Sequence, residues 1–217
     1  TASINALLIS SHSYYGAMGR PLQLMADHGV PKADNSKRRL PRVWVKHHEG
    51  YFSETKLRHR APDPNALYAG NEVFSDLADA AKARDIRLYA RHYQPSKEAA
   101  RYVDGFAEVL AQDHHGKPQK KPCWNNPDYR GYLLGTMRDM FENYPLDGLQ
   151  YGAERLTPLA EVVFEGAGFI CFCEHCRNRG RDEGIDVERA REGGRAMCEL
   201  VTSLQSGTAT TPDGVLP

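Results

Sequence analysis

Short apolar runs alternate with polar loops and amphipathic segments along this chain. Residues 4–10 read INALLIS, and further short runs with apolar centres cover residues 42–47, 86–90 and 147–151. Runs of this length between polar loops are typical of strands in a parallel sheet that is covered on both faces. The sequence therefore predicts four strands, each followed by a loop.

Segments with helical periodicity lie between and after these runs. Residues 21–28 can form a short helix, and residues 71–84 repeat apolar positions at helical spacing, with Asn71 as the capping residue. Residues 187–204 form a last predicted helix. Its expected buried face consists of Ala190, Met197, Leu200, Val201 and Leu204.

The helix with the strongest start signal lies before the fourth strand. Asn126 suits the N-cap and Pro127 suits the first helical position, so this helix should run to about Tyr144. Apolar spacing predicts its buried stripe: Leu133, Leu134, Met137 and Phe141.

Strands that each lead through a loop into a helix form βα units and hence a parallel sheet. Two architectures fit: a complete open α/β domain, or the first half of an α/β barrel of the (β/α)8 TIM type, which typically needs about 250 residues in full. The ending DGVLP favours the barrel, because it resembles the start of another element. We therefore expect residues 1–206 to be the N-terminal part of a TIM barrel and residues 207–217 to be linker-like.

Composition and charge narrow the classes of function. The chain has 217 residues, of which 41% are hydrophobic and 26% charged, values that are ordinary for a globular protein. Its 28 basic and 28 acidic residues cancel, which disfavours a nucleic-acid partner. No apolar run approaches the roughly 20 residues of a membrane span, so no membrane partner is expected. The start, TASINALL, leaves the compartment open.

The cysteines are clustered rather than spread along the chain. Cys171, Cys173 and Cys176 form a C-x-C-x-x-C motif, and Cys123 lies 48 residues before it. Zinc binds four soft ligands in a tetrahedron, and a tight turn can present several thiolates. Cys123 precedes the helix that leads into the fourth strand and the motif follows that strand, so both should lie at one end of the sheet. We predict a structural zinc bound by these four cysteines.

Other interpretations of the cysteines stay open. They could be free or disulfide-bonded, and His175, inside the motif, could replace one thiolate. A catalytic zinc is disfavoured because four thiolates leave no open coordination position. Cys198, on the last predicted helix, is expected to be a small buried hydrophobic residue.

Three stretches resemble barrel glycoside hydrolases: PCWNNPDYR at residues 122–130, LDGL at residues 146–149 and CFCEHC at residues 171–176. The cysteine pattern is similar to that of the family 42 β-galactosidases, in which it holds a structural zinc. The NNP-x-Y/W-R and Y-x-V/L-DG elements resemble those of glycosyl hydrolases related to the α-L-fucosidase barrels. The resemblance is specific over about residues 105–180.

The resemblance implies a TIM barrel, a carbohydrate substrate and carboxylate catalysis. In family 42 the fourth strand ends in Asn-Glu, where the glutamate is the general acid/base; the matching residues here are Ala153 and Glu154. In the fucosidase-like group the strand ends in an aspartate nucleophile, and Gly152 matches it here. Glu154 is thus the implied catalytic residue, as acid/base or nucleophile, without the preceding asparagine of family 42.

The position of Glu154 just past a predicted strand agrees with a catalytic role, because barrel enzymes keep their chemistry at the carboxyl ends of strands. Glycoside cleavage needs a second carboxylic group. The sequence does not identify it, and Glu49 and Glu54 are weaker candidates.

Histidine, arginine and aromatic residues recur at the ends of the predicted strands. Planar donors can bind sugar hydroxyls and ring faces can stack on sugar C–H surfaces, so we expect these residues to line a substrate pocket. The expected substrate-binding residues are His12, His47, His48, Arg91, His92, Gln150, Tyr151 and Arg155. A three-histidine catalytic metal site is a lesser alternative, since no H-E-x-x-H motif is present.

We therefore expect a glycoside hydrolase-like enzyme that acts on a carbohydrate and carries a structural zinc. Two alternatives stay open: a non-catalytic carbohydrate-binding barrel, and a zinc-stabilised interaction module. The neutral charge and the regular βα pattern disfavour the module. A homo-oligomer is compatible with the sequence.

Overall fold

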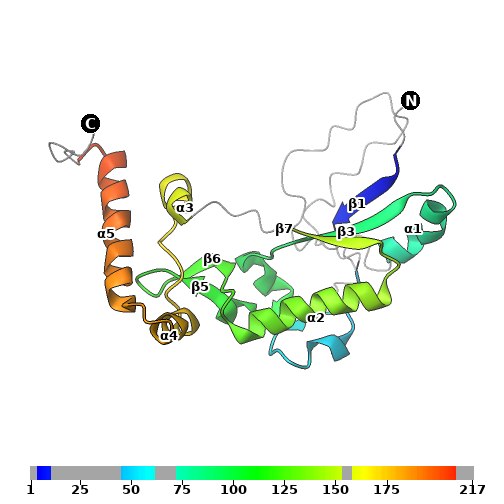
Figure 1. Cartoon of the computed structure of the whole chain (residues 1–217), viewed down its shortest axis with the longest axis horizontal. Coiled ribbons are helices and arrows are strands. Elements are labelled where there is room, and N and C mark those ends of the chain that lie inside the picture. Colours follow the sequence, from blue (N-terminus) through cyan, green and yellow to red (C-terminus); the bar gives the residue numbers. More distant parts are fainter. Residues whose placement is uncertain (1–3, 11–44, 62–71, 153–157, 209–217) are drawn as a thin grey trace.

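The computed structural model describes residues 4–10, 45–61, 72–152 and 158–208. The molecule is elongated, with a parallel sheet near one end and a group of helices at the other (Figure 1). Helix α2 (Pro127–Asn143) runs along the molecule between these ends (Figure 1). Within the described part, no helix is long and apolar enough to span a membrane.

The parallel sheet has three strands in the order β1-β3-β7. These are β1 (Ala6–Ser10), β3 (Arg87–Tyr93) and β7 (Gly148–Gly152). Three of the four predicted strands are thus confirmed. The fourth, residues 42–47, is not: residues 42–44 lie outside the described part, and residues 45–47 belong to no strand.

Helices cover one face of this sheet. Helix α1 (Val73–Lys82) and α2 both pack on it, through a core that includes Phe74, Ala90 and Met140. Ile9 of β1 and Leu149 of β7 contact the same core. Because successive strand residues point to opposite faces, Ala90 and His92 face the helices, while Tyr89 and Arg91 lie on the opposite face.

The segment between β3 and α2 forms a second core together with residues 49–59, which precede β3 in the chain. Two hydrogen-bonded pairs of short antiparallel strands form here: β2 (Arg58–His59) with β4 (Val103–Asp104), and β5 (Leu110–Gln112) with β6 (Pro118–Pro122). Three 3-10 helices accompany them: η2 (Glu49–Phe52), η3 (Lys97–Arg101) and η4 (Phe106–Val109). The buried members of this core are Phe52, Leu57, Ala99, Val103, Phe106, Val109, Leu110, Tyr129 and Tyr132.

The C-terminal helices lie at the end of the molecule away from the parallel sheet (Figure 1). They are α3 (Pro158–Glu165), α4 (Glu174–Asp182) and α5 (Val187–Gln205). The side chain of Gln205 donates a hydrogen bond to the carbonyl of Val163, which ties α5 to α3. The prediction of a helix over residues 187–204 is confirmed.

The prediction of a half TIM barrel is wrong. Over the described residues, the chain has a small mixed α/β fold with three parallel strands in one sheet and short antiparallel sheets. Strand β1 pairs directly with β3, from Ala6–Arg87 to Ser10–Arg91, so the edge of β3 that an intervening strand would need is already occupied. Residues 94–122 then build the second core, which interrupts the regular βα repeat.

The predicted buried stripe of α2 is also wrong in part. Leu133 is buried, but Leu134 and Phe141 are 49% and 55% exposed. The helix instead buries Gly135 and Asp139, because the backbone of residues 51–54 packs closely against it. A Cβ atom at Gly135 would collide with the carbonyl oxygen of Tyr51, so only glycine permits this approach.

Candidate functional site

The four predicted cysteine ligands come together in space. Cys123 lies between β6 and α2, Cys171 and Cys173 precede α4, and Cys176 is in its first turn. Their four Sγ atoms all lie within 4.8 Å of one another, and within the described part of the chain they are the group that could hold a metal ion. The Sγ of Cys123 is 3.4 Å from that of Cys176 and 3.3 Å from that of Cys173.

Backbone hydrogen bonds hold the two cysteine segments together. The N–H of Phe172 donates to the carbonyl of Gln112 on β5 at 2.9 Å, and Asp113 and Ile170 form an isolated antiparallel bridge. The N–H of Cys123 donates to the carbonyl of Val109 at 2.8 Å. The segment before α4 therefore lies against the β5–β6 pair, beside Cys123.

This geometry fits a tetrahedral metal ion. Zinc with thiolate ligands at about 2.3 Å needs sulfurs about 3.8 Å apart, which lies within the observed range of 3.3 to 4.8 Å. The cysteines are not disulfide-bonded. The Asn125 amide donates a hydrogen bond to the Sγ of Cys176 at 3.3 Å, and Arg179 donates to the Asn125 carbonyl oxygen at 2.9 Å, so a second layer supports the sulfurs.

The four cysteine thiols differ in pKa. Hydrogen bonds from Cys123 and Cys171, and one from the Asn125 amide, lower the pKa of the Cys176 thiol to about 7. The hydrogen bond from Cys123 also brings the pKa of Cys173 far below its ordinary value, while hydrogen bonds to Cys171 and burial raise that of Cys123. The pKa is thus lowered for two of the four thiols, Cys173 and Cys176, and raised for the other two, Cys123 and Cys171.

The other cysteine-related expectations have different outcomes. His175 is exposed and is not among the four grouped ligands. Cys198 is half-buried rather than buried, and its Sγ lies 4.0 Å from Nδ1 of His114. Among the described residues, no three-histidine group lies close enough to hold a metal ion.

The predicted substrate residues on the parallel sheet divide between its two faces. Arg91 and Gln150 are register partners on the face opposite the helices, near the carboxyl ends of their strands. His92 and Tyr151 are the next register pair and lie on the face that the helices cover, where their rings stack with centroids 6.1 Å apart. The residues that were expected to converge on one pocket are therefore separated by the sheet.

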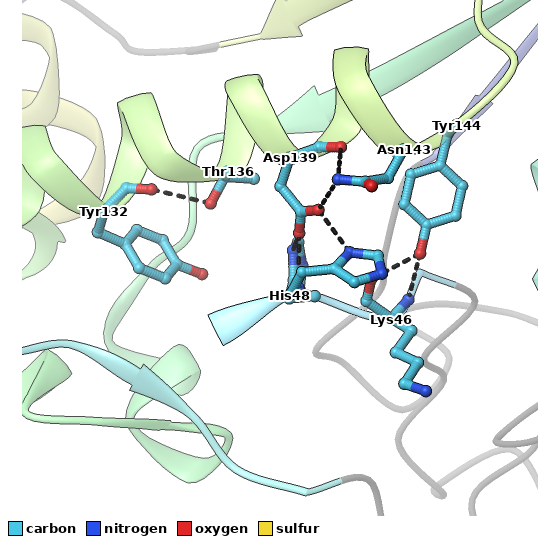
Figure 2. Close-up of polar contacts among 8 residues, drawn as sticks. Lys46, His48, Tyr132, Thr136, Asp139, Asn143 and Tyr144 are labelled. Carbon is cyan, nitrogen blue, oxygen red and sulfur yellow. Dashed lines mark hydrogen bonds and ion pairs between the residues drawn. The ribbon is translucent and has the colours of Figure 1, made fainter. Parts of the chain in front are cut away.

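His48 lies against helix α2 rather than over the sheet edge (Figure 2). His47 also contacts this helix, through Asp139. The carboxylate of Asp139 is fully buried and accepts hydrogen bonds from Nδ1 of His47 at 3.1 Å and from Nδ1 of His48 at 2.7 Å. The backbone N–H of His48 and the side-chain amide of Asn143 also donate to it, at 2.9 and 3.0 Å. One carboxylate thus fixes both histidines to the helix.

Tyr144 binds the same segment one residue earlier, at the backbone of Lys46 (Figure 2). The Tyr144 hydroxyl donates to the carbonyl of Lys46 at 2.5 Å and accepts from its N–H at 2.9 Å. Burial raises the pKa of Tyr144 to about 12. It therefore stays protonated and keeps its donor role at neutral pH.

Two buried imidazoles, those of His59 and His92, have strongly lowered pKa values. The ring of His47 stacks on that of His59 with centroids 3.9 Å apart. Burial, with a contribution from His47, lowers the pKa of His59 to about 2 and that of His92 to about 3. Burial opposes ionisation of Asp139 as well, but hydrogen bonds from His47 and His48 outweigh it and lower the pKa of that carboxyl. This cluster is an internal polar core.

Sequence reasoning missed His59, Asp139 and Tyr144 as members of this cluster. His59 falls in a charged run, RHR, and Asp139 falls on a helix face that apolar spacing assigns to solvent. No local signal marks either residue, because their partners are tens of residues away along the chain: 91 residues separate His48 from Asp139.

Several predicted site residues lie outside the described part of the chain. These are His12, Glu154 and Arg155. The weaker carboxylate candidates are Glu49, in η2, and Glu54, which follows it, and both are exposed. Neither residue belongs to a strand of the parallel sheet, so neither is in register with Arg91 and Gln150.

No family model matches this sequence, and no characterised protein and no solved structure is significantly similar to it. Function must therefore be inferred from the cysteine cluster and the sheet.

Proposed function

We propose that this protein is a carbohydrate-active enzyme that cleaves a glycosidic bond beyond the carboxyl ends of the strands of the parallel sheet, with Glu154 as acid/base or nucleophile. The observation that carries the proposal is the register pairing of Arg91 with Gln150 at the carboxyl ends of β3 and β7. Ligands of open α/β sheets bind beyond the carboxyl ends of the strands. Glu154 follows two residues after β7 ends at Gly152.

The side chains in this register row suit a sugar. A guanidinium offers five donors in a plane, and an amide offers both donors and an acceptor, so together they can bind several hydroxyls. Gln150 is exposed and Arg91 is half-buried. The resemblance of residues 122–130 and 171–176 to glycoside hydrolases supports the same substrate class.

We further propose that the tetracysteine centre binds zinc and that its role is structural. Four thiolates are the preferred donor set of structural zinc sites and leave no coordination position for a substrate. Cys123, Cys171, Cys173 and Cys176 would hold the ion, and the ion would join the β5–β6 pair to α4.

The test of the enzymatic proposal is the Glu154→Gln variant, assayed with p-nitrophenyl β-D-galactopyranoside and p-nitrophenyl α-L-fucopyranoside. Loss of a catalytic carboxyl should lower kcat by a factor of about 100 or more, with little change in KM. Glu199→Gln is the matched control, because Glu199 is exposed on α5 and pairs only with Arg195 of the same helix. Equal turnover by the Glu154→Gln variant and the control would refute the assignment.

A second candidate is a carbohydrate-binding protein without hydrolytic activity. Within the described part of the sheet, no carboxylate is in register with Arg91 and Gln150. Hydrolysis requires two carboxylic groups about 5 to 9.5 Å apart. Saccharide binding by calorimetry, without turnover of either chromogenic glycoside between pH 4 and pH 9, would favour this candidate.

A further inference from the structure

A turn beside the cysteine cluster connects Cys123 to helix α4. The backbone N–H of Asn126 donates to the carbonyl of Cys123 at 3.2 Å, so residues 123–126 form a turn that contains Asn125. The side-chain amide of Asn125 donates a hydrogen bond at 3.3 Å to the Sγ of Cys176, in the first turn of α4. Asn125 therefore joins the segment that carries the single cysteine to the segment that carries the other three.

A neighbouring arginine fixes which way the Asn125 amide points. Nη1 of Arg179 donates to Oδ1 of Asn125 at 2.9 Å, and Nε of the same guanidinium donates to Glu183 at 2.9 Å. Because an arginine can only donate hydrogen bonds, it faces the amide oxygen and leaves the NH2 group toward the sulfur. Arg179 and Cys176 are three residues apart on α4, so they lie on one face of the helix. Every contact from Glu183 to the sulfur thus joins a donor to an acceptor.

We infer that Asn125 is a positioning residue for the metal ion of the tetracysteine centre, and that Arg179 sets the orientation of its amide. This inference rests on the proposal that the centre binds zinc. Four thiolates outweigh the charge of one divalent ion, so the loaded centre is an anion that an N–H donor stabilises. The same contact holds the Cys123 segment against α4 before the ion binds, which lowers the entropic cost of ordering the ligands.

The test is the zinc dissociation constant of the full chain, measured at neutral pH by competition with a chromophoric chelator. Asn125→Ala removes the donor, and zinc should bind about tenfold more weakly, because groups that orient a metal ligand contribute to affinity on this scale. Asn125→Asp keeps an oxygen for Arg179 but turns a carboxylate toward the thiolates. Its loss of affinity should therefore be larger, about 100-fold.

Arg179→Gln tests the orienting contact. The Arg179 side chain is 62% exposed, so this variant should keep the fold, and its zinc dissociation constant should rise about threefold. In the Asn125→Ala background the same substitution should add no further loss, because Arg179 acts through the amide. Asn178→Ala is the matched control: Asn178, also on α4, accepts a hydrogen bond from Arg181 at 3.1 Å, and within the described contacts this pair forms no hydrogen bond to a sulfur.

Cobalt in place of zinc gives a readout that a purely structural role would not change. A hydrogen bond withdraws electron density from a thiolate sulfur. Its loss in Asn125→Ala should therefore move the thiolate-to-cobalt charge-transfer band to longer wavelength, and Asn178→Ala should leave the band where it is. A band at the wild-type position in Asn125→Ala would overturn the direct contact with the sulfur.

Failure of this inference and failure of the zinc proposal give different results. If the wild type binds neither zinc nor cobalt, the metal assignment fails and the inference fails with it. If the wild type binds zinc and both Asn125 variants bind it equally well, the zinc site stands and the positioning role is wrong. Zinc affinity in Asn125→Asp at or above that of Asn125→Ala would also overturn the role of the N–H donor. Should the Asn125 variants not fold, Arg179→Gln decides, and wild-type affinity with a wild-type cobalt band would refute the inference.

Discussion

The cysteine cluster and the histidine cluster around Asp139 both consist of polar side chains inside the protein. They differ in how the sequence specifies them. Three of the four cysteines lie within six residues, and the fourth stands beside a helix start that the sequence marks. The histidine cluster is assembled from His47, His59, His92 and Asp139, whose spacing along the chain carries no pattern. A local motif can therefore be predicted from the sequence, whereas an internal polar network needs the fold.

The two regions also differ in what stabilises them. The four thiols of the cysteine cluster lie close together and come from two segments of the chain that a bound cation would join, so the stability of this region should depend on an ion. In the histidine cluster, burial lowers the pKa of His59 and His92, and the carboxylate of Asp139 accepts hydrogen bonds from His47 and His48 within the chain.

Loss of the metal should have the largest effect. We expect about one zinc per chain by elemental analysis, and a fall in unfolding free energy of about 5 kcal/mol or more on chelation, because the binding free energy of a structural zinc contributes directly to folding. Cys173→Ser should reproduce the effect. Cys198→Ser is the control and should retain the zinc, since Cys198 lies outside the group. A zinc-free protein with unchanged unfolding would contradict the metal assignment.

The second-largest effect should come from acid, which destabilises the histidine cluster. His59 and His92 have pKa values near 2 and 3 in the folded protein, whereas an unfolded histidine titrates near 6.5. Below pH 6.5 the unfolded state therefore binds more protons, and stability falls as the pH falls. Each histidine should cost about 2 kcal/mol between pH 7 and pH 5.

Urea unfolding at a series of pH values measures this dependence. His59→Gln should remove roughly half of the pH dependence assigned to the cluster. His175→Gln is the control, because His175 is exposed. Parallel pH profiles for wild type and His59→Gln would show that His59 is not held neutral by burial.

The third-largest loss of stability should follow removal of the Asp139 carboxylate, which joins the histidine cluster to α2. Asp139→Ala leaves His47 and His48 without their shared acceptor and should cost about 3 kcal/mol of unfolding free energy. Glu142→Gln, an exposed neighbour on the same helix, should cost less than about 0.5 kcal/mol. Chemical denaturation at pH 7 makes the comparison, and equal costs would mean that the Asp139 hydrogen bonds add no net stability.

The smallest effect concerns the start of α2. The Asn126 side chain accepts hydrogen bonds from the N–H groups of Asp128 and Tyr129, so Asn126→Ala should cost about 1 kcal/mol. Asn126→Asp keeps the acceptor and should cost much less. Because Cys123 lies three residues before the cap, zinc content measured in both variants would show whether the cap also positions the metal ligand.

The sequence predicted those features whose cause is local. Asn126 as N-cap and Pro127 in the first turn are confirmed, as are the four cysteines as neighbours. The predicted face of α5 failed, because Met197, Leu200 and Leu204 are 39% to 49% exposed and only Val201 of these is buried. Apolar periodicity identifies a helix, but the partners available to it decide which face is covered.

The fold-level error has the same cause. Pairing of β1 with β3 and formation of the second core by residues 94–122 depend on contacts between distant segments. Short apolar runs predict strands without stating which strand each will join. The separation of Arg91 and Gln150 from His92 and Tyr151 likewise depends on which face of the sheet the helices cover.

Gly135 couples the packing of residues 49–54 on α2 to the position of the two histidines that precede them. Residues 49–54 can approach α2 only because Gly135 has no Cβ, and the imidazoles just before that segment reach the helix at Asp139, one turn further along. Any larger residue at 135 would lift the segment and draw His47 and His48 out of reach of their acceptor. A single methyl group on the helix would therefore disrupt a polar cluster with which it makes no contact.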